Sequence, residues 1–228
     1  MITAQTRLVA LLGRPVSNSL SPAMQNAAFA ARGLDWAYVA LDVEPEAFAT
    51  AVHGLAASGF AGANVTTPHK LAAAELADTD APSVNTLVFG DGRIRGHSTD
   101  AAVLATLDDP HSPVILGDGG SAAAFRQALP QARVFARRGD WPPDVAGADL
   151  VVNATSERDE ALVGLSPGQT LVDLPYPETA TGAAARAAGA TVIDGLEALV
   201  AQGAAAFELW TGVPAPVDVM RAAVRSHA

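Results

Sequence analysis

The chain of 228 residues predicts an α/β fold in two domains. Apolar runs typical of strands alternate with amphipathic or alanine-rich helical segments almost throughout, which indicates largely parallel sheets. Half of the residues are apolar and only 17% are charged, so the chain can bury a proper core. The run Asp108-Asp109-Pro110-His111-Ser112-Pro113 interrupts the alternation near the middle. We therefore place one domain at residues 1–100 and a second at 101–204, with helices from about 205–228 returning to the first.

The first half contains clear start, stop and turn signals. Strands are expected near residues 8–12, 36–41, 60–65, 84–89 and 93–97. Gly90-Asp91-Gly92 lies between the last two and predicts a hairpin. Ser21 and Pro22 predict an N-cap followed by a first-turn proline, and Gly33 a helix end. Further helices are expected at about 44–57 and after Pro68.

The second half repeats the alternation. A helical stretch is expected after Asp100 as far as Leu107, and an alanine-rich helix after Gly120. Strands are expected near residues 114–116, 133–136, 150–153, 170–174 and 191–193, and a long helical region from about Leu196.

Composition excludes several classes of function. The net charge of −10 and the pI near 4.8 argue against binding to nucleic acid or to anionic lipid. The absence of cysteine excludes disulfides and thiolate metal ligands, and with no histidine cluster we expect no metal site. The apolar run Leu8–Leu12 is too short to span a membrane. A cytoplasmic location is expected.

Residues 116–122, Leu-Gly-Asp-Gly-Gly-Ser-Ala, form a glycine-rich turn between a predicted strand and a predicted helix. Small residues there let the backbone approach a pyrophosphate, and the helix N-terminus offers N–H groups and a positive dipole end. The alternative is a tight turn without a ligand. Asp118 counts against the dinucleotide interpretation unless its carboxylate points outward.

Arg137 and Arg138 follow the next predicted strand, where an NAD site usually has an acidic residue for the ribose hydroxyls. An arginine there suits the 2′-phosphate of NADP by charge and by planar hydrogen bonding. Two solvated arginines are the alternative. The second domain is thus predicted to be an abbreviated Rossmann-like nucleotide-binding domain.

Three polar clusters lie at ends of predicted strands in the first half, where ligands gather in open α/β sheets. They are residues 17–21, residues 64–70, and residues 84–86 with 98–100. Hydroxyls, amides, one ammonium and one carboxylate suit the binding of a polyhydroxylated small molecule and one proton transfer. Ser21 and Asp100 could instead be helix caps, and Asn85 a hydrogen bonder at a strand end.

Lys70 is the only lysine of the chain, whereas arginine occurs thirteen times. An ammonium can release a proton near neutral pH when its surroundings shift its pKa, and a guanidinium cannot. Lys70 is therefore a candidate for proton transfer. The alternative is a solvated lysine at a helix start.

Taken together, these segments resemble the shikimate dehydrogenase family. The matching segments occur in the family's order and span nearly the whole chain: residues 13–22, 64–70, 84–86, 96–100, 116–120, 149–155, 173–177 and 202–212.

The resemblance implies an NADP-dependent, reversible reduction of 3-dehydroshikimate to shikimate, with the active site between a substrate domain and a nucleotide-binding domain. Lys70 and Asp100 match the family's catalytic pair. Residues matching substrate-binding positions are Ser19, Ser21, Asn64, Thr66, Asn85, Tyr176 and Gln202. Residues matching cofactor-binding positions are Gly117, Gly119, Gly120, Ser121, Arg137, Thr155 and Gly195. The chain is expected to be a monomer or a homodimer.

The sequence departs from the family pattern mostly on the cofactor side. Asp118 stands where a small apolar residue is usual, and the chain is shortened between Arg138 and Asp149, where a crossover helix normally lies. On the substrate side, the family usually has histidine where Asn18 and Gln25 stand, and asparagine where Ser98 stands.

Two alternatives follow. One is a paralogue that acts on quinate or a related cyclohexane carboxylic acid, or that uses NAD. The other is a catalytically weak shikimate-binding or regulatory protein with impaired cofactor binding.

Overall fold

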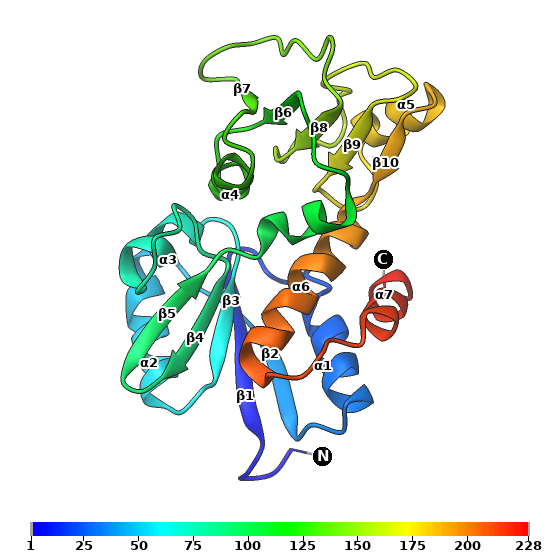
Figure 1. Ribbon diagram of the computed structural model, residues 1–228. Coiled ribbons are helices and arrows are strands. Elements are labelled where there is room, and N and C mark those ends of the chain that lie inside the picture. Colours follow the sequence, from blue (N-terminus) through cyan, green and yellow to red (C-terminus); the bar gives the residue numbers. More distant parts are fainter. Residues whose placement is uncertain (1, 228) are drawn as a thin grey trace. The chain divides into compact units, whose positions relative to one another are not determined.

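The computed structural model describes residues 2–227 and confirms the predicted α/β class (Figure 1). The chain divides into two compact units, Met1–Thr99 with Val200–Ala228, and Asp100–Leu199. Each unit is built on its own five-stranded sheet. No helix within residues 2–227 combines the length and the apolar character that a membrane crossing requires.

The first unit contains a mixed sheet in the order β2-β1-β3-β4-β5. Strand β1 pairs in parallel with both β2 and β3, whereas β4 and β5 continue the sheet in antiparallel fashion. The strands are β1 (Arg7–Gly13), β2 (Trp36–Asp42), β3 (Gly62–Val65), β4 (Thr86–Gly90) and β5 (Arg93–His97). The expected hairpin is confirmed: Asp91 and Gly92 between β4 and β5 have φ values of +53° and +69°, the left-handed backbone that a tight hairpin turn needs.

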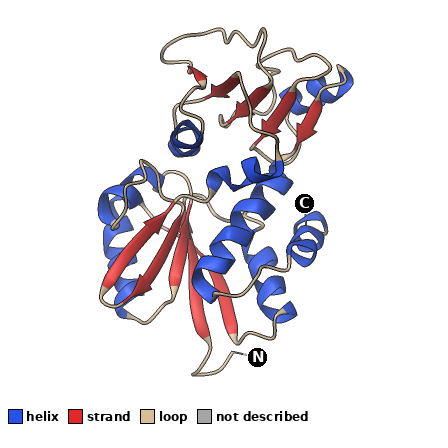
Figure 2. Cartoon of the chain, in the orientation of Figure 1, coloured by secondary structure: helices blue, strands red, loops and turns tan. Residues whose placement is uncertain are grey.

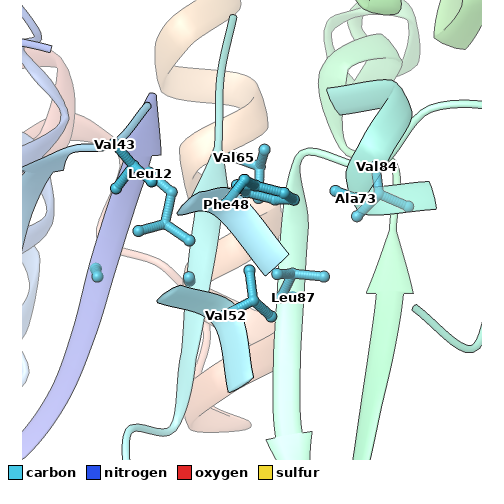
Figure 3. Close-up of a cluster of buried hydrophobic side chains, with 10 residues drawn as sticks. Leu12, Val43, Phe48, Val52, Val65, Ala73, Val84 and Leu87 are labelled. Carbon is cyan, nitrogen blue, oxygen red and sulfur yellow. The ribbon is translucent and has the colours of Figure 1, made fainter. Parts of the chain in front are cut away.

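One face of this sheet is covered by α2 (Phe48–Ala57), which follows η1 (Pro45–Ala47), and by α3 (Lys70–Leu76). In Figure 3, Phe48 and Val52 of α2 pack toward Leu12, Val65 and Leu87 of the strands. Because successive strand residues point to opposite faces, Gly62 and Asn64 of β3 point the other way.

The opposite face is covered by α1 (Ser21–Ala31) and α6 (Gly195–Thr211), and α7 (Val217–Arg225) packs against α1. The Trp210 indole N–H donates to the Leu87 carbonyl at 2.9 Å. A Cβ at Gly62 would lie only 2.4 Å from that indole nitrogen, so the indole requires a glycine in β3. Phe207 of α6 stacks on Phe29 of α1 at 5.4 Å between ring centroids.

The start of α1 corrects one sequence prediction. Ser21 is not the N-cap: it is the first residue of the helix, and the cap position is Leu20, which makes no side-chain cap hydrogen bond. The Ser21 N–H instead donates to Ser19 Oγ at 3.3 Å. A seryl turn before the helix thus replaces the expected cap, while Gly33, at φ +64°, follows the helix as expected.

The second unit contains an entirely parallel sheet in the order β10-β9-β8-β6-β7. Its strands are β6 (Pro113–Leu116), β7 (Arg133–Phe135), β8 (Leu150–Asn153), β9 (Thr170–Asp173) and β10 (Thr191–Ile193). The order reverses between β6 and β8, because the chain steps from β6 outward to β7 and then returns to the other side of β6. Doubly wound sheets bind ligands at such a reversal, beyond the carboxyl ends of the strands.

Three helical segments lie wholly in this unit, η2 (Asp100–Thr106), α4 (Gly120–Ala128) and α5 (Ala180–Ala187), and α6 begins in it. The helical stretch expected after Asp100 is a 3-10 helix. No helix connects β7 to β8 across residues 136–149, in keeping with the expected shortening, and β8–β9 is also joined by a loop (Figure 2). Val163 and Leu165 from the second loop fill the core against Val151 and Leu171, where a helix would otherwise pack.

Candidate active site

In the first unit, the loops after β1 and β3 touch each other at the reversal of strand order. A Cβ at Gly13 would lie 2.2 Å from Thr66 Cγ2, so the close approach of these loops requires glycine. The Arg14 N–H donates to the Thr67 carbonyl at 2.9 Å, and the Thr66 N–H to the Leu12 carbonyl at 2.9 Å. The loops carrying Ser19 and Ser21, and Thr66 and Lys70, are thereby joined at one edge of the sheet.

A buried network of amides and hydroxyls lies beside these loops. Tyr38 Oη donates to Asn64 Oδ1 at 2.8 Å, which directs the Asn64 amide nitrogen to the Asn85 carbonyl and to Thr86 Oγ1, both at 3.0 Å. With the Oδ1 lone pair occupied by Tyr38, the orientation of the Asn64 amide is fixed.

Asn85 is the centre of this network. Its Oδ1 accepts from the Thr99 N–H at 2.7 Å, and its Nδ2 donates to Thr99 Oγ1 and to Gln202 Oε1, both at 2.9 Å. The predicted residues Asn64, Asn85 and Gln202 therefore lie together, although they are spread over most of the sequence. Asp100 follows Thr99 directly and is the first residue of η2.

Lys70 begins α3, and its carbonyl accepts from the Val84 N–H at 3.0 Å, which ties α3 to the segment that carries Asn85. His69 directly precedes Lys70 in the chain, and it is only 2% exposed. Its Nε2 lies 2.8 Å from the Val43 carbonyl, and its ring stacks on Phe48 at 4.6 Å. His69 is thus a packed core residue that anchors the backbone next to Lys70.

In the second unit, the glycine turn lies at the reversal between β6 and β8. Gly117 has a φ of +119°, and a Cβ there would lie 3.0 Å from the Ala154 carbonyl oxygen, so the turn passes directly against the loop after β8. Gly119 caps α4 and faces open space, with no atom within 4 Å of a built Cβ.

This turn fits a dinucleotide phosphate. The open face at Gly119 leaves room for a ligand against the backbone, and α4 directs its first N–H groups there. Asp118 is exposed, so its carboxylate does not fill the turn. Gly120 and Ser121 are the first two residues of α4.

Thr155 is held by a buried network that sequence reasoning missed. The Asn153 Oδ1 accepts from Thr155 Oγ1 at 2.7 Å, and the Asn153 Nδ2 donates to Asp173 Oδ1 at 2.7 Å. Thr179 Oγ1 donates to the second Asp173 oxygen at 2.7 Å. These bonds fix the carboxyl ends of β8 and β9 against each other.

Arg137 lies beyond the end of β7 and contacts two carboxylates, Glu157 at 3.3 Å and Glu160 at 3.1 Å. Its guanidinium carbon also lies 5.6 Å from the centroid of the Trp141 ring. The sequence predicted Arg137 as a cofactor residue but gave no sign of these two acidic partners.

The remaining predicted residues lie at the carboxyl end of β9 and at the start of α6. Tyr176 follows β9 after two residues, and Gly195 is the first residue of α6. A Cβ at Gly195 would lie 2.4 Å from the Pro175 carbonyl oxygen, so α6 begins in backbone contact with the segment that carries Tyr176.

Tyr38 is the member of the first network that sequence reasoning did not single out, whereas Thr86 and Thr99 lie in the polar clusters named above. One signal was available for Tyr38, because it is one of only two tyrosines and lies in an otherwise apolar strand. A buried tyrosine needs a partner for its hydroxyl, and Asn64 of β3 provides one.

Together, the two units define a class: an α/β oxidoreductase with a dinucleotide turn in one unit and a rigid amide and hydroxyl site in the other. Comparison with known proteins identifies the family within this class. Residues 11–87 match the shikimate dehydrogenase substrate-binding domain, and residues 195–225 match the shikimate 5′-dehydrogenase C-terminal domain.

The chain is 41% identical to shikimate dehydrogenase (NADP(+)) of Moorella thermoacetica, over 98% of this chain and 94% of that protein. Its structure is similar to the crystal structure of the Aquifex aeolicus shikimate dehydrogenase (TM-score 0.89, 32% identity, 99% and 100% of the two chains). It is also similar to the Thermus thermophilus enzyme in complex with NADP(H) and shikimate (TM-score 0.85, 31% identity, 98% and 100%). The chain belongs to the shikimate dehydrogenase family, which confirms the resemblance stated above.

The alignment with the Moorella thermoacetica enzyme is 278 positions long, whereas the chain has 228 residues. The relative therefore has segments that this chain lacks. Loops in place of helices between β7 and β8 and between β8 and β9 are consistent with that difference.

Proposed function

We propose that the protein catalyses the NADP-dependent, reversible reduction of 3-dehydroshikimate to shikimate. The observation that supports this most directly is the fixed network of Asn64, Asn85 and Gln202, placed beside the segment that carries Lys70. The network fixes these amides and already uses both N–H groups of Asn64 and of Asn85, so a ring with several hydroxyl groups would bind through their oxygen lone pairs and through the Gln202 amide. The similarity to enzymes that bind shikimate and NADP(H) supports the same substrates.

In this proposal Lys70 and Asp100 are the catalytic pair. The bound nicotinamide supplies the hydride that reduces the ketone carbon. Lys70 Nζ donates a proton to the oxygen that develops negative charge, and takes it back in the reverse direction. Asp100 favours the ammonium form of the lysine, because a carboxylate within a few ångströms stabilises that charge.

The substrate is proposed to be held by residues from both ends of the chain. Ser19 and Ser21 bind the carboxylate, where the seryl turn presents hydroxyl and N–H groups close together. The ring hydroxyls are proposed to be bound by Asn64, Thr66, Asn85, Tyr176 and Gln202.

The cofactor is proposed to lie along the carboxyl edge of the second sheet. Gly117, Gly119, Gly120 and Ser121 would hold the pyrophosphate at the start of α4. Thr155 and Gly195 border the same edge, after β8 and β10. Arg137 is proposed to bind the 2′-phosphate of NADP.

The deciding experiment is a steady-state assay that follows the absorbance of the reduced nicotinamide, with purified protein, shikimate, and NADP or NAD in parallel. Rapid shikimate-dependent reduction of NADP, with NAD much slower, is the expected result. The same assay with quinate tests the paralogue alternative.

One observation favours the alternative in which NAD is used or cofactor binding is weak, namely the two carboxylates that contact Arg137. Preference for NAD in the assay would support an NAD-dependent enzyme. No turnover with either cofactor, in protein that binds shikimate by calorimetry, would support a binding protein. The protein is further proposed to act in the cytoplasm, as a monomer or a homodimer.

A further inference from the structure

The ion cluster around Arg137 lies directly over the predicted cofactor edge of the second sheet. Arg137 follows β7, and Glu157 and Glu160 follow β8, while β6 with its glycine turn lies between these two strands (Figure 1). The cluster therefore bridges the loops on both sides of the turn that is proposed to hold the pyrophosphate.

Both carboxylates contact the same nitrogen of Arg137. Glu157 Oε2 and Glu160 Oε2 accept from Nη2 at 3.3 Å and 3.1 Å. Two negative charges thus face one positive charge, and the cluster has a net charge of −1. A phosphate monoester, with a charge of about −1.5 to −2 at neutral pH, is repelled by such a cluster unless a carboxylate leaves it.

The two carboxylates are held very differently. Glu157 is 28% exposed, and its Oε1 accepts from the N–H groups of Asp159 and Arg158, both at 3.1 Å. These backbone hydrogen bonds lower the pKa of Glu157, that of Asp159 most, and the Arg137 charge lowers it further. The Glu157 N–H also donates to Thr155 Oγ1 at 3.2 Å, which connects it to Asn153 and the end of β8.

Glu160 is 69% exposed, and its carboxylate contacts Arg137 alone among the described residues. An exposed ion pair of this kind contributes little to stability. Glu160 is therefore the carboxylate that an incoming anion can displace, whereas Glu157 stays in place.

We infer that Glu160 competes with the 2′-phosphate of NADP for Arg137 and thereby limits the preference of this protein for NADP over NAD. Glu157 adds a second, fixed negative charge beside Arg137. This inference rests on the proposed function. NAD has a 2′-hydroxyl in place of the phosphate and meets no such repulsion. Acidic residues near the ribose can even accept a hydrogen bond from that hydroxyl.

The test is isothermal titration of NADP and of NAD into the wild-type protein and Glu160→Gln. Glutamine keeps the shape of the side chain and removes its charge. We expect the NADP dissociation constant to fall roughly two- to tenfold in Glu160→Gln, with NAD binding unchanged or weaker. Titration of 2′,5′-ADP, which has the 2′-phosphate but no nicotinamide, should show the same gain.

Glu178→Gln is the matched control. It removes the same charge from an exposed pair, Glu178 with Arg186 at 2.7 Å, after β9 and away from the β7 edge. If Glu160→Gln gained no more NADP affinity than Glu178→Gln, the change in net charge alone would explain the effect, and the inference would be overturned.

Arg137→Gln provides the second control, because the inference requires Glu160 to act through Arg137. In an Arg137→Gln background, Glu160→Gln should change NADP affinity no more than Glu178→Gln does. An undiminished gain in that background would overturn the inference while leaving the proposed function intact. Absence of binding by either dinucleotide to all of these proteins would overturn the proposed function itself.

Discussion

At the scale of single residues, the structure assigns clear structural roles to the neighbours of Lys70. His69 is buried against Phe48 and bonded to the Val43 carbonyl, so its imidazole serves the core. The Lys70 carbonyl is bonded to Val84 N–H. The backbone on either side of Lys70 is therefore fixed, which suits a group that must present a proton at one position.

Replacing Lys70 by alanine is expected to lower kcat by about a hundred- to ten-thousand-fold. The KM for shikimate should stay within a few-fold, because the amides and hydroxyls proposed to hold the substrate remain. Steady-state kinetics in both directions measures the two effects separately.

Lys70→Arg is the informative companion, since it keeps the positive charge but gives a group that does not release a proton near neutral pH. We expect it to be nearly as slow as Lys70→Ala. Near-normal turnover in Lys70→Arg would show that charge alone is needed, and near-normal turnover in Lys70→Ala would remove the residue from the chemistry.

Sequence reasoning at this scale depended on local patterns, and it was weakest where partners are distant in the chain. The helix start at Ser21-Pro22 was found to within one residue, yet the cap itself was wrong because the helix already includes Ser21, which makes Leu20 the cap position. The acidic partners of Arg137 lie 20 and 23 residues away, in a loop with no periodic pattern. Nothing local in the sequence indicates that pairing.

At the scale of elements, the glycine turn between β6 and α4 contains two glycines with different physical requirements. Gly117 needs its positive φ and the absence of a Cβ, whereas Gly119 has an ordinary φ of −82° and open space around it. One glycine is therefore required by the fold, and the other is free to serve a ligand.

Gly117→Ala is expected to destabilise the protein by roughly 1–3 kcal/mol, because alanine must adopt a strained backbone against Ala154. Gly119→Ala should lower the free energy of unfolding less than Gly117→Ala does, by the loss of a good N-cap residue alone, but it should weaken NADP binding, since its methyl group would project into the space proposed for the pyrophosphate. Urea denaturation and calorimetric titration of both variants test this contrast. Unchanged NADP affinity in Gly119→Ala would mean that the cofactor does not approach the turn.

Asp149 fastens the loop before β6 to the start of β8. Burial opposes its ionisation, but the backbone N–H groups that donate to its carboxylate, those of His111 and Ser112 foremost, together outweigh burial, so its pKa lies below the ordinary value of 3.8. A carboxylate with a lowered pKa in the folded state stabilises the fold above its unfolded pKa. That contribution is lost as the pH falls through 3.8 toward the folded value.

Asp149→Asn is therefore expected to lower the free energy of unfolding by roughly 1–2 kcal/mol at pH 7, and the difference from wild type should shrink below about pH 4. Denaturant titrations at a series of pH values measure it. Asp140→Asn, which removes an exposed acid from the β7–β8 loop, is the control. A difference that stays constant down to about pH 3 would contradict the linkage.

Element prediction was most reliable where strands are short apolar runs bounded by turn residues, as at Val114–Leu116 and Leu150–Asn153. The absence of a helix between β8 and β9 was not foreseen. Val163 and Leu165 in that stretch lie two residues apart and fill the core from a loop. Two apolar residues at this spacing fit a strand or a loop without periodicity, so the sequence pattern could not reveal that a loop fills the core here.

At the scale of the whole molecule, the first unit is discontinuous and the second is continuous. The face of the first sheet opposite α2 depends on the C-terminal helices, through the Phe207–Phe29 stack and the bonds from Gln25 to the Gly203 carbonyl and from Trp210 to the Leu87 carbonyl. Residues 1–99 alone leave that face covered only by α1.

A chain shortened to residues 1–199 is therefore expected to lose the folded first unit. Residues 100–199 expressed alone should keep the parallel sheet, because both core-filling loops and both α-helices of the second sheet lie within them. Near-ultraviolet circular dichroism and limited proteolysis distinguish the outcomes. A protease-resistant fragment of residues 1–99 from the shortened chain would show that the first unit does not need α6 and α7.

The same discontinuity has a consequence for synthesis on the ribosome. The strands of the first sheet emerge first, but the helix that covers one of its faces follows only after a further 100 residues, from Asp100 to Leu199. At ordinary translation rates this interval lasts roughly 5–20 s. Throughout it, Met24 and Phe29, both buried in the finished fold, lack their partners from α6. The nascent chain thus presents apolar side chains of α1 to chaperones while the second unit is already free to fold, so messages truncated before α6 should yield aggregates in which only the second unit is native.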